Sequence, residues 1–157
     1  MKIYDTELQA EDAYLLARVS SKEQKEAGNS IPAQVERLRN YIDKSSNKLI
    51  LVEEFTFDES ASKTDRKKFE AFMNRVIKSN KTIALCADKI DRLIRDFPTW
   101  LPKLDKLRKA GSIELHFVSD NIVIHQYSPA TELFQFNMGV ALAQYYADSI
   151  SDNTKRG

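Results

Sequence analysis

The chain has 157 residues, enough for one domain with a substantial core, and its formal net charge is only +1. This charge is not the strongly basic balance of a typical nucleic-acid-binding domain, so such a role must rest on local features. The single cysteine, Cys86, lies in an apolar run, which excludes a disulfide framework and a cysteine-based metal site. With no apolar run of about 18 residues and no signal-peptide core, we expect a cytoplasmic protein that does not enter the membrane.

The first expected elements are a strand and a helix. Residues 1–12 form a polar leader without an assigned element, and the apolar run after it predicts a strand at about 13–19. Ser30 is a suitable N-cap and Pro32 fits the first turn of a helix whose apolar stripe continues to about Lys44.

A second strand and a second helix follow. Branched apolar residues predict the strand at 49–56, and Asp65 can cap the helix after it. This helix carries an apolar stripe that we expect in the core, formed by Phe69, Phe72, Met73, Val76 and Ile77.

The third strand, predicted at 82–87, leads into a helical pattern that contains prolines. Because a proline costs about 3 kcal/mol inside a regular helix, we expect a break near Phe97 and a restart at Pro98. Gly111 is a suitable end for the second piece, and residues 113–118 predict a fourth strand.

The last helix is expected from Ser128 as its cap, with Pro129 in the first position, to at least Ile150. It has more apolar residues than one surface stripe needs: Leu133, Phe134, Phe136, Met138, Val140, Leu142, Tyr145, Tyr146 and Ile150. Either this helix is buried within the domain or it packs against another subunit.

Strand and helix alternate four times, which predicts an α/β fold with a mostly parallel sheet, helices on both faces and a long C-terminal helix. Ligands of such sheets gather at the carboxyl ends of the strands. Polar clusters follow all four predicted strands: Ser20-Ser21, Asp58 to Ser62, Asp88 to Arg92, and Ser119 to Asn121. We therefore expect the functional site at that edge of the sheet.

This predicted edge combines a hydroxyl with several arginines. Residues two apart in a strand share a face, so Arg18 and Ser20 should project together. Arg66 follows the second polar cluster, and Arg92 and Arg95 follow the third. Guanidinium groups around a hydroxyl can neutralise a phosphoryl centre by hydrogen bonds and charge, without a metal.

Motifs for nucleotide cofactors are not found in the sequence. Its four glycines form neither a phosphate-binding loop nor a dinucleotide fingerprint, so no cofactor is expected. The two histidines, His116 and His125, lack ligand-like spacing and are expected to be structural, which leaves serine–histidine hydrolysis poorly supported.

Three short motifs follow one another along the chain: Ala17-Arg18-Val19-Ser20-Ser21 with Gln24 and Gln34, then Asp58, Ser62 and Arg66, and then Asp91-Arg92-Leu93 with Arg95. In this order they resemble the catalytic domain of the serine recombinases, the resolvase and invertase group, and most of all the large serine integrases and transposases. The resemblance runs from Tyr14 to Gly157.

The resemblance implies a site-specific recombinase that cuts and rejoins double-stranded DNA with no cofactor and no metal. Ser20 would be the nucleophile, attacking a backbone phosphate to give a 5'-phosphoserine link and a free 3'-hydroxyl. Asp91 would orient arginines or take part in proton transfer. The phosphate would be surrounded by Arg18, Arg66, Arg92 and Arg95, and the loop that bears Ser20 would be supported by Gln24, Gln34 and Asp58.

The resemblance also implies self-association as a dimer and a tetramer through the last helix. Residues 1–12 would be a leader, 13–127 the resolvase-like catalytic domain, and 128–157 an oligomerisation helix leading toward DNA-binding domains. Two positions depart from the family pattern. Lys63 follows Ser62 where a glycine is common, and Asp152-Asn153 stands where many members have an acidic residue followed by arginine, so Arg156 or Lys155 is a candidate substitute.

Two other functions remain open at this point. A metal-dependent nuclease would hold Mg²⁺ with Asp58, Glu59, Asp88 and Asp91, although arginines are mixed among these carboxylates. A receiver-like signalling domain has the same alternation of elements, but it needs an acidic pair where Arg18 and Ser20 stand.

Overall fold

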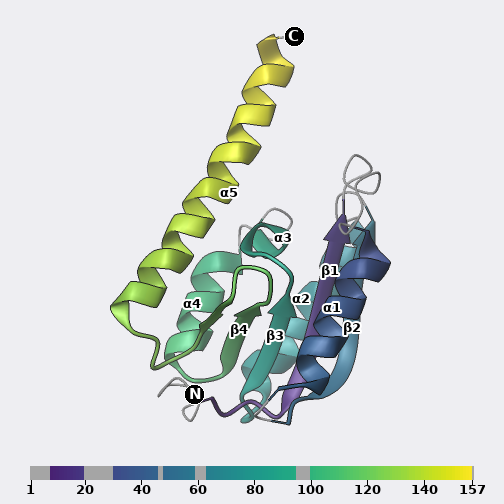
Figure 1. Ribbon diagram of the computed structural model, residues 1–157, viewed down its shortest axis with the longest axis vertical. Coiled ribbons are helices and arrows are strands. Elements are labelled where there is room, and N and C mark those ends of the chain that lie inside the picture. The colour runs from purple at the N-terminus through teal and green to yellow at the C-terminus, as the bar shows by residue number, and fades with distance from the viewer. Residues whose placement is uncertain (1–7, 20–29, 46–47, 59–62, 95–99, 157) are drawn as a thin grey trace.

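The protein folds around a five-stranded sheet with the strand order β2-β1-β3-β4-β5. The structure, a computed structural model, describes residues 8–19, 30–45, 48–58, 63–94 and 100–156. The strands are β1 (Asp12–Val19), β2 (Ile50–Asp58), β3 (Ile83–Ala87), β4 (Ile113–Phe117) and β5 (Ile122–Ile124). The first four pair in parallel, and β5 pairs antiparallel with β4 (Figure 1). The predicted α/β fold with a mostly parallel sheet is thus confirmed.

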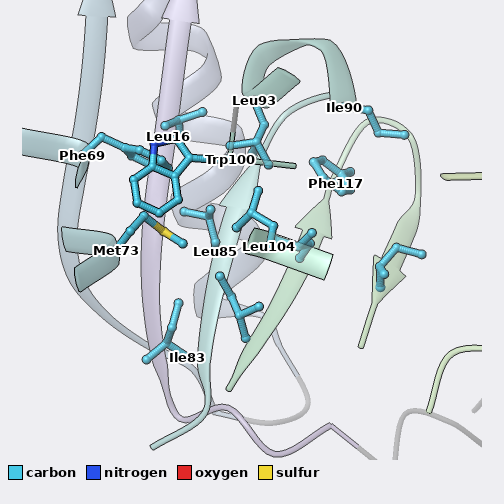
Figure 2. Close-up of a cluster of buried hydrophobic side chains, with 14 of the residues drawn as sticks. Leu16, Phe69, Met73, Ile83, Leu85, Ile90, Leu93, Trp100, Leu104 and Phe117 are labelled. Carbon is cyan, nitrogen blue, oxygen red and sulfur yellow. The ribbon is translucent and has the colours of Figure 1, made fainter. Parts of the chain in front are cut away.

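Helices cover both faces of this sheet, as the sequence predicted. They are α1 (Ile31–Asp43), α2 (Lys63–Lys78), α3 (Ile90–Ile94), α4 (Leu101–Lys109) and α5 (Ala130–Arg156). The buried side chains of α1 form one core cluster with Leu15 and Ala17 of β1. The second and larger cluster joins α2, α4 and the first part of α5 to the opposite face, and it includes Leu16 and Leu85 (Figure 2).

Burial on both faces explains the composition of β1. Side chains alternate along a strand, so Leu15 enters the cluster under α1 while its neighbour Leu16 enters the larger cluster. A strand covered on both sides reads as a continuous apolar run instead of an alternating one. This is why the stretch before Arg18 is apolar at every position from Leu15 to Ala17.

The start of α1 agrees with the prediction, whereas the start of α2 does not. The Ser30 hydroxyl accepts a hydrogen bond from the backbone N–H of Ala33 at 3.3 Å and so caps α1. Helix α2 begins at Lys63, so Asp65 lies in its first turn and the predicted cap at Asp65 is wrong.

One member of the predicted α2 stripe is not in the core. The other four members, Phe69, Phe72, Met73 and Val76, are buried. The side chain of Ile77 is 52% exposed. At about 100° per residue, Ile77 lies about 80° around the helix from Phe69, at the margin of the buried face.

The helical pattern after β3 is divided between two helices, α3 and α4. Helix α3 ends at Ile94 and α4 begins at Leu101, while Phe97 and Pro98 lie outside the described residues. The predicted restart at Pro98 therefore lies outside the described residues, and Pro102 falls in the first turn of α4, where its missing N–H costs least. Gly111 follows this helix with a left-handed φ of 77°, which suits glycine.

Two features between β4 and α5 differ from the sequence prediction. Strand β5 was not predicted, although Asn121, with a left-handed φ of 53°, makes a tight turn and three branched residues follow it. The Ser128 hydroxyl accepts a hydrogen bond from the backbone N–H of His125 at 2.8 Å and does not cap α5. Helix α5 begins at Ala130, directly after Pro129.

Helix α5 carries two apolar stripes, and it extends well beyond the sheet (Figure 1). The inner stripe packs on the larger core cluster and consists of Leu133, Phe136, Val140 and Ala143. The outer stripe is exposed and consists of Phe134, Met138, Leu142 and Tyr145. The helix is therefore neither wholly buried nor apolar on one face only. No helix in the described part of the chain is long and apolar enough to cross a membrane.

We expect Phe72→Ala to lower the free energy of unfolding by about 4 kcal/mol, because it removes a buried ring that contacts Phe55 and Phe69. Ile77→Ala is the matched control on the same helix, and it should change the free energy by less than about 0.5 kcal/mol because its side chain is exposed. Urea denaturation measures both values. Similar losses for the two variants would contradict the assignment of the core.

Candidate active site

The carboxyl ends of β1, β2 and β3 meet at one edge of the sheet, which is the edge beside α3 in Figure 1. Arg18 pairs with Phe57 of β2, and Val19 pairs with Asp58. Pairing between β1 and β3 ends at Leu16 and Ala87, one residue before Asp88. The strand ends that precede three of the predicted polar clusters therefore lie side by side, because the strands are parallel and adjacent.

Gln34 of α1 is fully buried against the end of β1. Its side-chain amide donates to the backbone carbonyl of Arg18 at 2.9 Å, and its Oε1 accepts from the backbone N–H of Arg18 at 3.1 Å. Since β3 no longer pairs with β1 at this point, Gln34 makes hydrogen bonds of the kind that a neighbouring strand would make. Gln34 therefore holds the backbone of Arg18 at the strand end that leads to Ser20.

Two arginine side chains are buried at this edge. Arg18 is 5% exposed and Arg92, in α3, is 4% exposed. Arginine is among the residue types that are rarely fully buried, because taking its charge out of water costs several kcal/mol unless an anion or acceptors compensate. Two such residues, one near the end of β1 and one on the helix after β3, are typical of a site that binds an anionic group.

Asp91 lies beside Arg92 on α3 and is half-buried. Its Oδ1 atom is buried and has no hydrogen-bond partner among the described residues. A buried carboxylate oxygen without a donor is costly, and a catalytic role, in which a substrate or a proton supplies the missing partner, is one explanation for such an atom.

Asp88, at the end of β3, is neutralised by Arg37 of α1. The Arg37 guanidinium donates from Nε and Nη2 to the two carboxylate oxygens at 3.1 and 2.9 Å, and the Ser119 hydroxyl donates a further short hydrogen bond. Burial raises the pKa of Asp88, but the bonds from Arg37 and Ser119 outweigh it and hold the pKa below its usual range. These contacts tie together α1 and the ends of β3 and β4.

This ion pair bears on the metal-nuclease interpretation. Asp88 was one of four candidate Mg²⁺ ligands, but Arg37 and Ser119 already engage both of its oxygens. Where residues are described, no group of three or more histidine, cysteine, aspartate or glutamate side chains could hold a metal ion. Glu59 and the side chain of Asp58 lie outside the described residues.

The remaining candidate residues divide into exposed and undescribed ones. Arg66 lies on the first turn of α2 and is exposed, in contrast to the two buried arginines. Outside the described residues lie Ser20, Ser21, Gln24, Ser62 and Arg95, together with the side chains of Asp152, Asn153, Lys155 and Arg156.

Two polar contacts of α1 were missed from the sequence. Besides Arg37, the Tyr41 hydroxyl lies 2.6 Å from Nδ1 of His116, whose Nε2 lies 3.1 Å from the buried carboxylate of Glu114. The available signal was spacing: Gln34, Arg37 and Tyr41 recur at helical intervals beside the apolar stripe, and Glu114 and His116 stand two apart in a strand. His116 is thus a buried, hydrogen-bonded residue, as expected.

The model of the resolvase N-terminal domain matches residues 13–157, which is nearly the whole chain. The chain belongs to the resolvase family. It is a serine recombinase catalytic domain, an enzyme domain of site-specific DNA recombination, as the three sequence motifs predicted. This result decides against the receiver-like signalling domain.

A solved structure agrees with this assignment at the level of the fold. The resolvase-family chain is similar to the N-terminal catalytic domain of TP901-1 integrase, with a TM-score of 0.57 and 19% sequence identity. The similarity covers 87% of this chain and 97% of that domain. No curated protein sequence gives a significant match.

We expect Asp88→Asn to lower the free energy of unfolding of this resolvase-family domain by about 2 kcal/mol at pH 7, because Arg37 and Ser119 lose an ionised acceptor. The lowered folded-state pKa means that this contribution is complete above the unfolded pKa of about 4 and is lost as the pH falls through the folded pKa. The difference between wild type and variant in urea denaturation should therefore shrink below pH 4.

The control for this prediction is Glu54→Gln, which breaks the exposed ion pair between Glu54 and Arg39. Exposed pairs contribute little, so its cost should stay below about 1 kcal/mol at pH 7. A cost equal to that of Asp88→Asn, or a difference for Asp88→Asn that does not shrink as the pH falls below 4, would contradict the role given to Asp88.

Proposed function

We propose that this domain cleaves and rejoins DNA through Ser20, which attacks a backbone phosphate and forms a 5'-phosphoserine link while releasing a 3'-hydroxyl. Re-attack by a 3'-hydroxyl on the phosphoserine, after strands are exchanged, reverses the step and frees Ser20. The observation that carries the proposal is the burial of Arg18, near the end of the strand that leads to Ser20, and of Arg92 on α3, which contacts that strand.

The two buried arginines support phosphoryl chemistry in a specific way. A phosphate gains negative charge on its non-bridging oxygens as the nucleophile attacks, and fixed guanidinium donors stabilise that charge with little reorganisation. The backbone of Arg18 is held by Gln34, and the turn before Arg92 is held through Asp88. The donors are therefore preorganised before DNA arrives.

The other candidate residues take supporting roles in the proposal. The buried Oδ1 of Asp91 accepts from an arginine or receives the proton of the serine hydroxyl. Arg66, exposed on α2, reaches the phosphate from the solvent side, and Arg95 is the fourth arginine at the phosphate. Gln24, Gln34 and Asp58 support the segment that carries Ser20.

We also propose that α5 associates with a second copy of the chain, giving dimers and, during strand exchange, a tetramer. The outer stripe of α5 is the observation that favours this, because four large apolar side chains on one helix face are exposed in the single chain. Isologous pairing of two such helices buries the stripe in both copies. In this proposal 13–127 is the catalytic unit, 128–157 is the association helix, and the choice of DNA site resides in further DNA-binding domains.

Ser20→Ala should abolish covalent attachment to DNA, because the oxygen that forms the phosphoester is removed. The substrate is a duplex selected from a random-sequence pool by its retention on the denatured wild-type protein, and the adduct is measured by gel electrophoresis in SDS. Ser21→Ala is the matched control, since it removes the neighbouring hydroxyl, and it should retain the adduct.

The same assay separates the proposal from a metal-dependent nuclease. Adduct formation should be unchanged by excess EDTA, since charge is neutralised by arginines and not by a cation. An adduct that survives Ser20→Ala, or cleavage that occurs only with Mg²⁺ and leaves no adduct, would overturn the proposed function.

Replacing Phe134 and Tyr145 together by lysine should shift the protein toward the monomer in sedimentation velocity at micromolar concentration, because both side chains belong to the exposed outer stripe. Gln135→Lys, an exposed polar position on the same helix, is the matched control and should not change the sedimentation coefficient. Identical sedimentation of all three proteins would contradict association through this stripe.

A further inference from the structure

Helix α3 carries Asp91 and Arg92 but is only five residues long, so it has little stability of its own. It is held in place by its neighbours. The carboxylate of Asp120, in the turn between β4 and β5, accepts a hydrogen bond from the backbone N–H of Ile90 at 2.8 Å and caps the helix. It also contacts α5, which lies beside it (Figure 1), and the strands β1 and β3.

The contact between α3 and α5 depends on a glycine. An ideal Cβ atom added to Gly139 of α5 would lie 2.5 Å from Cδ1 of Ile90, closer than real Cβ contacts, whereas Cγ1 and Cβ of Ile90 would lie at ordinary distances of 3.6 and 3.7 Å. Ile90 is buried and stands at the margin of the larger core cluster, apart from Leu93 (Figure 2). A single methyl group of Ile90 therefore occupies the space that a side chain at position 139 would fill.

The same region reaches the candidate site. A groove of about 210 Å³ between α3 and α5 is lined by Asp91, Asp120 and Gly139, together with Leu142, Ala143 and Tyr146 of α5. The residue after Ile90 is Asp91, and Arg92 follows it. A shift of the α3 backbone away from α5 would therefore move the carboxylate and the guanidinium that follow Ile90 in the chain.

We propose that Gly139 is a positioning residue for the strand-cleavage reaction. By leaving space for Cδ1 of Ile90, it sets the distance between α5 and α3 and thereby the position of Asp91 and Arg92. The inference rests on the proposed function of Ser20 and goes beyond it, because it assigns a role in the chemistry to a residue of α5 that carries no functional group.

The test is a double-mutant cycle in which one variant introduces a clashing atom at position 139 and the other deletes the atom of Ile90 that it would meet. Gly139→Ala adds the Cβ atom, and we expect about a tenfold lower rate constant of adduct formation at saturating DNA. An effect of this size is within the range of interaction energies measured between residues in contact. Ile90→Val deletes Cδ1, the atom with which the new Cβ collides, so the double variant should recover to within about threefold of Ile90→Val alone. Because alanine is a better helix former than glycine, loss of helix propensity cannot account for the decrease.

Ile113→Val is the matched control for the rescue. Ile113 is buried in the same core cluster, at the amino end of β4, and the change removes the same atom from it. Combined with Gly139→Ala it should give no recovery. A second readout is amide hydrogen exchange of residues 88–94, which should be faster by about tenfold in Gly139→Ala and return toward the wild-type rate only with Ile90→Val.

If Gly139→Ala does not fold, Ile90→Ala in the wild-type background opens the same contact from the other side. It should slow adduct formation by about tenfold, whereas Ile113→Ala, with the same atoms lost from the same cluster, should not once both are folded.

The possible failures are distinguishable. A wild-type protein that forms no adduct would overturn the proposed function. A wild-type protein that forms the adduct, with Gly139→Ala equally fast, or with rescue by Ile113→Val as complete as by Ile90→Val, would overturn only the role of Gly139. Slower adduct formation without faster exchange of 88–94 would also overturn it, since α3 would then not have moved.

Discussion

The structure depends on the parallel pairing of β1 with β2 on one side and β3 on the other. A strand in this position is covered on both faces, so the side chains from Leu15 to Ala17, directly before Arg18, are apolar and buried. The same pairing brings three strand ends to one edge, and Arg18 stands there with its backbone held and its guanidinium buried. The position of the charged group is thus a consequence of where the apolar run ends.

Helix α1 makes hydrogen bonds to polar groups on three of the strands or at their ends. Gln34, Arg37 and Tyr41 lie on one side of this helix and make hydrogen bonds to β1, to Asp88 after β3, and to His116 of β4 respectively. Buried polar groups cost free energy unless they are paired, and here each pairing also fixes a strand relative to the helix. The helix therefore fixes the candidate site from one face while α5 and α3 approach it from the other side.

The agreement between sequence and structure has a physical pattern. Elements with a strong period, such as α1 with its Ser30 cap, agree with the prediction because local hydrogen bonds and one apolar stripe decide them. The short strand β5 was missed because three residues are too few to show a period, and its assignment as a strand depends on its pairing with β4. Ile77 was wrongly placed in the core because periodicity gives the centre of a buried face but not its width.

For the candidate site, the sequence by itself determined which residue types follow each strand. The three motifs were enough to recognise the family, because a short motif is read from the order of residues and needs no knowledge of tertiary contacts. Only the tertiary structure decided which of these side chains are buried, since Arg18 and Arg92 are enclosed while Arg66 is exposed, and all three look alike in sequence. It also decided that Asp88 pairs with Arg37, 51 positions away in the chain, and that Gly139 faces Ile90. Such contacts join segments distant in sequence, and only the packing of helices on the sheet brings them together.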